Sequence, residues 1–188
     1  MPHHYTLGSK RNISMHKHNT LYRFCPLCGG TLNTTLVKQG DPERPVCTKC
    51  GFIVYFDPKV AVGTIIRNQQ DEIALVKRSI EPGYGKWVFP GGYVDRGEQH
   101  LTAARREAQE EANLEINILE LVGIYSYQGE IPIIIVYAAS VIGGTLRAED
   151  ESSDAAWFKK AELPWSELAF KSTHDALKDY LKKTFKLF

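Results

Sequence analysis

The stretch "GGYVDRGEQHLTAARREAQEEANLEI", residues 91–116, decides the fold. Its apolar positions after the glycines are spaced by three, four and four residues, which predicts a helix over about residues 99–112. Most of these residues are small, so the helix can pack close to a sheet. The apolar positions are Leu101, Ala104, Ala108 and Ala112.

Three glutamates, Glu107, Glu110 and Glu111, lie within one turn near the end of this helix. Like charges at such spacing cost about 0.2–0.5 kcal/mol per pair. Acids in the last turn also oppose the helix dipole, at about 0.3–1 kcal/mol each. Arg106 can pair with Glu110, but one cation does not neutralise three acids. A divalent cation would offset the repulsion, whereas a solvated acidic face is the alternative interpretation.

The residues before the helix favour the metal interpretation. Gly91 and Gly92 form a loop whose backbone amides can approach an anion closely, and Glu98 stands at the entrance to the helix. Clustered carboxylate oxygens suit a hard ion such as Mg²⁺ or Mn²⁺, which is commonly shared with substrate phosphates. We therefore expect a divalent-cation site here, with Glu98 as a further candidate ligand.

Four cysteines form two C-x2-C pairs separated by eighteen residues: Cys25 with Cys28, and Cys47 with Cys50. Each pair can present two thiolates to one tetrahedral ion, and this spacing predicts a zinc ribbon. Two disulfides or a redox motif are the alternatives. The chain shows no export signal, and a redox motif would need one pair beside a βαβ unit. Four protein ligands make the predicted Zn²⁺ structural, not catalytic.

Composition sets the broad class of the protein. The chain has 188 residues, 43% hydrophobic and 24% charged, with 23 basic and 22 acidic side chains. This is a globular composition without a field that would attract nucleic acid or membrane, and three scattered cations in the ribbon do not favour nucleic-acid binding. No apolar run is long enough to span a membrane. We expect a cytoplasmic protein with a flexible tail (1–22), a zinc ribbon (23–57) and a main domain (58–188).

The main domain reads as strands with two helices. Strands are expected at 60–67 and 72–78, which form a hairpin, and at 116–127, 131–142 and 155–158. A closing helix is expected at 166–183, with Leu177, Tyr180 and Leu181 facing the core. Because strands and helices do not alternate regularly, we expect an α/β fold with a mixed sheet flanked by helices.

The chain resembles the Nudix hydrolases. Gly92, five residues, Glu98, seven residues and then "REAQEEANL" (106–114) match the Nudix box, G-x5-E-x7-R-E-U-x-E-E-x-G-U with U apolar, at every fixed position but one. The exception is Asn113, where the family pattern has glycine. Asparagine tolerates the left-handed conformation best among the other residues, so we expect the helix end to be preserved.

The resemblance implies an α/β/α sandwich and an Mg²⁺- or Mn²⁺-dependent hydrolase that cleaves the diphosphate bond of nucleoside diphosphate derivatives. It implies that Glu107, Glu110 and Glu111 hold the metal, that Glu110 or Glu111 deprotonates the attacking water, and that Arg106 orients them. Gly91 and Gly92 would line the site. Glu151 is a weaker candidate ligand, in an acidic loop that could equally be solvated.

The ribbon and the flanking segments resemble the branch that includes FAD and ADP-ribose pyrophosphatases, which implies a dinucleotide substrate, release of AMP and a possible homodimer. Arg78 is a candidate phosphate contact, and Trp87 and Tyr84, with Phe89 and Tyr93, are candidate platforms for a ring. The motif expected after the box in NADH pyrophosphatases is absent from 114–125. The alternatives are a nucleotide-sensing module whose ribbon binds nucleic acid or protein, and a hydrolase of oxidised nucleoside triphosphates.

Overall fold

The computed structural model describes residues 22–184. The chain divides into two compact units, the first ending at Asp57 and the second beginning at Pro58. The predicted N-terminal tail lies outside the described residues apart from Tyr22. The two units are described separately below.

The first unit is a small antiparallel hairpin with turns at either side. Strand β1 (Leu32–Thr35) pairs with β2 (Arg44–Cys47), in the register Leu32↔Cys47 to Thr35↔Arg44. The apolar residues buried in it, among those described, are Cys25, Pro45, Cys47 and Val54. Four such residues bury too little apolar surface to support a fold of this length, so the unit needs another source of stability.

The second unit contains a mixed six-stranded sheet, which confirms the fold class expected from the sequence. The strand order is β5-β4-β3-β7-β6, with β8 also paired to β4. The pair β3–β7 is parallel, and the other pairs are antiparallel. The strands are β3 (Lys59–Arg67), β4 (Ile73–Arg78), β5 (Trp87–Val88), β6 (Leu114–Tyr125), β7 (Pro132–Gly144) and β8 (Ser152–Phe158).

The glycine loop lies against strand β3. The expected hairpin of β3 and β4 is present and pairs through Arg67↔Ile73. Nearer the start of β3, Val62 N donates to Gly92 O at 2.8 Å and Thr64 N donates to Pro90 O at 2.9 Å. The backbone of residues 90–92 therefore extends the hydrogen bonding of β3, which fixes the loop in position.

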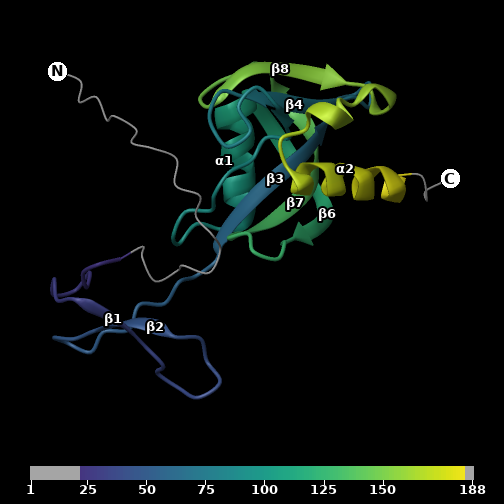
Figure 1. The fold of residues 1–188 in the computed structure, drawn as a ribbon. Helices are drawn as coiled ribbons and strands as arrows, with labels where there is room; N and C mark the ends of the chain where they lie inside the picture. The colour runs from purple at the N-terminus through teal and green to yellow at the C-terminus, as the bar shows by residue number, and fades with distance from the viewer. Residues whose placement is uncertain (1–21, 185–188) are drawn as a thin grey trace, which may run out of the picture. The chain divides into compact units, whose positions relative to one another are not determined.

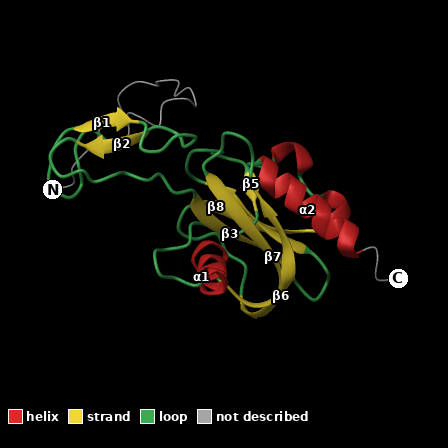
Figure 2. Cartoon of the chain, turned by 90° about the horizontal axis from the view of Figure 1, so that it is seen from below, coloured by secondary structure: helices red, strands yellow, loops and turns green. Residues whose placement is uncertain are grey.

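Two helices cover opposite faces of the sheet (Figure 1; Figure 2). Helix α1 (His100–Ala112) forms where the sequence predicts it. Helix α2 (Lys171–Thr184) begins five residues later than predicted. Residues Trp165–Glu167 form a 3₁₀ turn instead, and Ala169 N donates to Trp87 O at 2.8 Å. This pairing with β5 holds the chain extended, so the helix starts only at Lys171.

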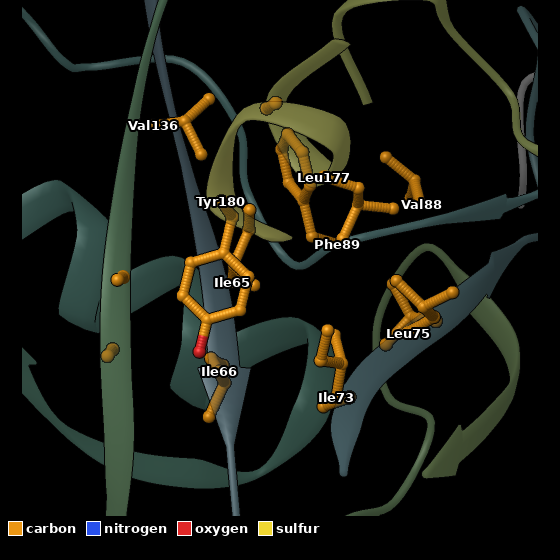
Figure 3. Packing of buried hydrophobic residues seen from close by; sticks show 14 of the residues in the cluster. Ile65, Ile66, Ile73, Leu75, Val88, Phe89, Val136, Leu177 and Tyr180 are labelled. Atoms are coloured by element: carbon orange, nitrogen blue, oxygen red, sulfur yellow. The ribbon is translucent and has the colours of Figure 1, made fainter. Parts of the chain in front are cut away.

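The core lies between the sheet and α2. Figure 3 shows Leu177 and Tyr180 of α2 among the side chains of β3 and β4, including Ile65, Ile73 and Leu75. Burying each large aliphatic side chain contributes about 1.5–3 kcal/mol. Leu177 and Tyr180 are buried and Leu181 packs against them, which confirms the predicted stripe.

On the other face, the small residues of α1 let the helix approach the sheet closely. Ala103 and Ala104 are fully buried against Val62 and Tyr137. Ala108 and Ala112 are also fully buried. The stripe predicted from the spacing of three and four residues is therefore the buried face, which leaves the glutamates on its border.

Among residues 22–184, no helix is long and apolar enough to cross a membrane. The cytoplasmic location and the homodimer stay predictions.

Candidate functional site

The glycine loop and α1 bring two of the glutamates against the backbone. Gly91 N donates to Glu111 Oε2 at 2.8 Å. A Cβ atom at Gly92 would lie 2.5 Å from Glu107 Oε1, so any side chain there would displace the Glu107 carboxylate from its present position. Glycine at position 92 therefore makes room for the Glu107 carboxylate.

Arg106 donates hydrogen bonds to the three glutamates of the site other than Glu111. Its Nη1 atom donates to Glu107 Oε1 and to Glu110 Oε2, both at 2.8 Å. Its Nε and Nη2 atoms donate to the two oxygens of Glu98, each at 3.0 Å. The predicted pair of Arg106 with Glu110 is present. The bidentate pair with Glu98 was not predicted, and it gives Glu98 two bonds to Arg106 where Glu107 and Glu110 have one each.

Arg106 and burial shift the pKa values of the glutamates in opposite directions. The hydrogen bonds from Arg106 lower the pKa of Glu98. Burial raises the pKa of Glu107, against the opposing effect of Arg106. Burial also raises the pKa of Glu111 to about 7, with the Gly91 N–H opposing and the Glu107 charge adding to the rise. The acidic end of the site thus carries an energetic cost that a bound cation would relieve.

A pH dependence of stability follows from Glu111. Its folded-state pKa of about 7 lies above the ordinary value of 4.5, so its contribution is present below pH 4.5 and is lost as the pH rises through 7. Without added divalent cation, the free energy of unfolding should fall between pH 5 and pH 8, by roughly 1–3 kcal/mol. Urea denaturation would show this fall in the wild type and a smaller one in Glu111→Gln. Equal pH slopes in the two proteins would contradict it.

Asn113 ends α1 in the left-handed conformation, as expected, with φ 53° and ψ 37°. Its N–H donates to Gln109 O at 3.0 Å, and its side-chain Nδ2 donates to Thr145 O at 3.0 Å. Two further carbonyls at the end of the helix accept from the next segment: Arg147 N donates to Ala112 O, and Glu149 N to Glu111 O. The substituted box position thus adds a bond that glycine could not make.

Asn113→Ala should destabilise the protein by about 1–2 kcal/mol, because alanine disfavours the left-handed region and lacks the bond to Thr145. Asn113→Gly should lower the free energy of unfolding by less than about 1 kcal/mol. Glycine adopts the left-handed conformation without strain, which offsets part of the loss of the side-chain bond to Thr145. Urea denaturation of the wild type and of both variants would measure these changes in the free energy of unfolding. An alanine variant as stable as the wild type would refute the interpretation.

One cavity of about 890 Å³ contains the site. It joins the glycine loop and the box glutamates to Arg78, the acidic loop and the first turn of α2. The structure therefore brings together most of the residues singled out in the sequence. The predicted site residues that line it are Arg78, Gly91, Gly92, Arg106, Glu107, Glu110, Glu111 and Glu151.

Two predicted ring platforms do not line the cavity. Trp87 is buried in the core, with its ring edge-on to Phe158 at 5.0 Å, and Tyr84 is 67% exposed. The other two candidates, Phe89 and Tyr93, do line it. Sequence reasoning missed two further aromatic residues in the lining, Tyr127 and Phe170, because they come from distant parts of the chain.

The four cysteines of the first unit converge, with all four Sγ atoms within 4.8 Å of one another. Cys28 Sγ lies 3.5 Å from Cys47 Sγ and 3.3 Å from Cys50 Sγ, far beyond the roughly 2.0 Å of a disulfide. Tetrahedral zinc with bonds of about 2.3 Å would place its sulfurs about 3.8 Å apart. The arrangement fits a four-coordinate ion.

Backbone N–H groups favour the ionised sulfur that such an ion requires. The N atoms of Lys49 and Cys50 lie 3.4 and 3.5 Å from Cys47 Sγ and donate to it. These donors, that of Cys50 first, lower the pKa of Cys47 to about 6. The Cys47 sulfur is therefore suited to thiolate ligation. Against the hydrogen bond from the Gly30 backbone, the neighbouring sulfurs of Cys50 and Cys47 raise the pKa of Cys28 to about 12, a crowding that a bound cation would relieve.

The box carboxylates suit a different kind of ion. Within residues 22–184, the cysteines are the one group of three or more metal-binding side chains that lie this close together. The oxygens of Glu107 and Glu110 instead meet at Arg106 Nη1, and Glu111 is held by Gly91. Carboxylate oxygens fit a hard divalent cation, and a turn of Glu107 and Glu110 away from Arg106 would gather them around it.

Comparisons with known proteins match both units. Residues 57–181 match the NUDIX domain, and residues 23–56 match the Nudix N-terminal zinc ribbon. An ADP-ribose pyrophosphatase of Methanocaldococcus jannaschii is 38% identical over 160 residues, 83% of this chain and 88% of that protein. The NAD-capped RNA hydrolase NudC of Pseudomonas aeruginosa is 29% identical over 150 residues, 79% of this chain but 50% of its own length.

A solved structure is similar over most of the chain. The crystal structure of a Nudix hydrolase from Nitrosomonas europaea has a TM-score of 0.83 and 32% identity, and the match covers 88% of this chain and 94% of that one. The box, the fold and both matched regions thus agree, and the chain belongs to the Nudix hydrolases that carry an N-terminal zinc-ribbon domain.

Proposed function

We propose that the protein hydrolyses the diphosphate bond of ADP-linked compounds, ADP-ribose or FAD among them, and releases AMP. The observation that carries this proposal is the single cavity in which the box glutamates, the glycine loop and Arg78 meet. The similarity to the archaeal ADP-ribose pyrophosphatase supports the substrate class. Domains are inferred at 23–57 for the ribbon and 58–188 for the hydrolase.

The size and polarity of the cavity fit a dinucleotide. Ligand sites commonly measure about 300–1,000 Å³, and 890 Å³ lies near the upper end of that range. Its lining includes the box glutamates together with aromatic and aliphatic residues such as Phe89, Tyr127 and Phe170. A substrate with a charged diphosphate and a ring matches this mixed lining.

Each residue has a role that its position supports. Gly91 and Gly92 line the cavity, where their backbone would lie beside a phosphate, and Arg78 contributes positive charge, which its electrostatic effect on Glu111 reflects. Glu110 or Glu111 takes the proton from the attacking water. Arg106 orients Glu107 and Glu110 and, through its hydrogen bonds to both, limits their repulsion while no cation is bound.

Mg²⁺ or Mn²⁺ held by Glu107, Glu110 and Glu111 would screen the diphosphate charge and polarise the bond to be broken. Glu151 lines the same cavity and is a further candidate ligand. Glu98 is better described as a residue that positions Arg106. In the first unit, we infer that Zn²⁺ bound by the four cysteines supplies the stability that its small core lacks.

A substrate panel tests the proposal. Purified protein with Mg²⁺ or Mn²⁺ should release AMP from ADP-ribose or FAD faster than it acts on nucleoside triphosphates or NADH. Faster turnover of oxidised nucleoside triphosphates would favour the sanitising alternative. Tight nucleotide binding without any product would favour the sensing module.

A further inference from the structure

Among the residues that the structure describes, Arg78 is the basic residue of the cavity without a carboxylate partner. The other basic residues of the lining, Arg106 and Lys171, each form ion pairs with carboxylates. Within residues 22–184, Arg78 forms no ion pair, and no atom accepts a hydrogen bond from its Nη1 or Nη2. A guanidinium suits carboxylates and phosphates, so the donors of both Nη groups remain available to a ligand.

The backbone of Arg78 is fixed at the end of β4, where the chain turns back. Arg78 N donates to Lys86 O and Gly85 N donates to Arg78 O, both at 2.9 Å. Residues 79–84 therefore form a loop that closes at the residue from which the guanidinium extends. Ser79 N also donates to Glu151 O at 2.8 Å, which ties the end of β4 to the acidic loop.

The same loop contacts the Arg78 side chain. Arg78 Nε donates to Pro82 O at 2.7 Å. Gly83, with φ 85°, packs beside the side chain, and a Cβ atom there would lie 3.1 Å from Ala169 Cβ and 3.4 Å from Arg78 Cδ. The Glu81 carboxylate accepts from Gly83 N at 3.0 Å, so this nearby acid is bonded to the loop and not to the guanidinium. The loop thus holds Arg78 through Nε.

Phe170 lies against the face of the same guanidinium. Arg78 Cζ is 5.2 Å from the centre of the ring, the distance of a cation–π contact. The ring is held in turn, because the preceding residue, Ala169, donates from its N to Trp87 O at 2.8 Å. A long side chain restrained by a ring and a carbonyl loses less rotamer freedom when it binds a ligand.

This restraint matters because Arg78 acts on the box without pairing with it. Its charge lowers the pKa of Glu111, against the larger effect of burial, although the two side chains form no ion pair. A freely moving arginine would be drawn to such a carboxylate and would occupy an oxygen that a cation needs. The ring and the carbonyl instead keep the guanidinium apart from the glutamates.

We propose that Pro82, Gly83 and Phe170, here called the arginine clamp, position Arg78 so that its Nη groups meet a phosphate of the substrate. In this account Phe170 acts through Arg78 and not through contact with the substrate. The inference rests on the proposed function, because it takes a diphosphate compound as the substrate. The effect of the ring on binding should therefore depend on the presence of Arg78.

A double-mutant cycle on ligand binding tests the arginine clamp in the full-length protein. The probe is adenosine 5′-(α,β-methylene)diphosphate with Mg²⁺, titrated by calorimetry, since its bridging carbon prevents hydrolysis. Arg78→Ala should raise the Kd about 10–100-fold through loss of charged hydrogen bonds, and Phe170→Leu about fivefold through loss of the cation–π contact. In the Arg78→Ala protein, Phe170→Leu should have no further effect, because the residue through which it acts is gone.

Further variants separate positioning from folding. Phe170→Tyr keeps a ring over the guanidinium and should bind the probe like the wild type. Trp165→Leu is the matched control, because Trp165 packs against the same core from the same segment but does not line the cavity, and its Kd should be unchanged. Gly83→Ala should raise the Kd in the presence of Arg78 alone, since a Cβ atom would strain the turn.

The kinetic constants give a second measurement. With ADP-ribose, Phe170→Leu should raise KM and leave kcat nearly unchanged, because a phosphate contact is present in both the ground state and the transition state. A fall in kcat with unchanged KM would contradict the arginine clamp.

Binding and hydrolysis fail separately. Equal effects of Phe170→Leu with and without Arg78 would overturn the arginine clamp, as would wild type that does not bind the probe or Arg78→Ala that binds it unchanged. The expected coupling in a protein that cleaves no ADP-linked compound would refute the proposed function and leave the arginine clamp standing. Hydrolysis of ADP-ribose without the coupling would do the reverse.

Discussion

Glu111→Gln is expected to lower kcat for ADP-ribose by about 10²–10⁴-fold, the range typical for loss of a general base. Glutamine keeps the shape and can accept the bond from Gly91 N, but it cannot take a proton and is a poor ligand for a hard cation. The residue is 6% exposed, so the buried charge disappears without a cavity forming. Initial rates at saturating substrate and Mg²⁺ measure the effect.

Folding controls make this result specific. Glu111→Gln should unfold at or above the wild-type temperature, since a buried charge has been removed. Glu120→Gln, at an exposed position on β6, should retain full activity. A Glu111→Gln enzyme with near-wild-type kcat would show that the box carboxylate has no role in the chemistry.

Cys47→Ser is expected to remove zinc from the protein and to unfold the first unit. The apolar residues buried in that unit, among those described, are two of the four cysteines, Pro45 and Val54, so the ion must provide most of its stability. Structural zinc supplies about 10–16 kcal/mol in comparable peptides. Zinc content per chain should fall from one toward zero, and backbone amide resonances of residues 23–57 should lose their dispersion.

A substitution in the ribbon away from the cysteines should leave the zinc in place. Thr34→Ser lies on the exposed side of β1 and should keep one zinc per chain. Because the second unit has its own sheet and core, its resonances should change little in Cys47→Ser. Unchanged zinc in the Cys47→Ser protein would refute ligation by the cluster.

Local spacing in the sequence predicts the parts of the site that lie on one element. The stripe of α1 and the pairing of Arg106 with Glu110 follow from helical geometry, and the structure contains both. Its glutamates do not meet at one point: Glu107 and Glu110 contact Arg106, and Glu111 accepts from Gly91. The left-handed end at Asn113 likewise follows from local backbone preference. Such features need no knowledge of the rest of the fold.

Contacts between distant segments could not be predicted in this way. The bond of Ala169 to Trp87 delays the start of α2, and no periodicity reveals it. The same contact explains why Trp87 belongs to the core although it stands beside the glycine loop in sequence. Tyr127, two residues after β6, and Phe170, just before α2, line one cavity because β6 and α2 pack together, and no spacing in the sequence shows this.

The most direct test of the account is product formation from ADP-ribose by the purified protein, measured with Mg²⁺ and again after Mg²⁺ is removed. The account predicts stoichiometric AMP and ribose 5-phosphate with Mg²⁺, and little of either without it or with Glu111→Gln. An absence of AMP with Mg²⁺ and Mn²⁺, in protein that retains its zinc and its fold, would contradict the central claim.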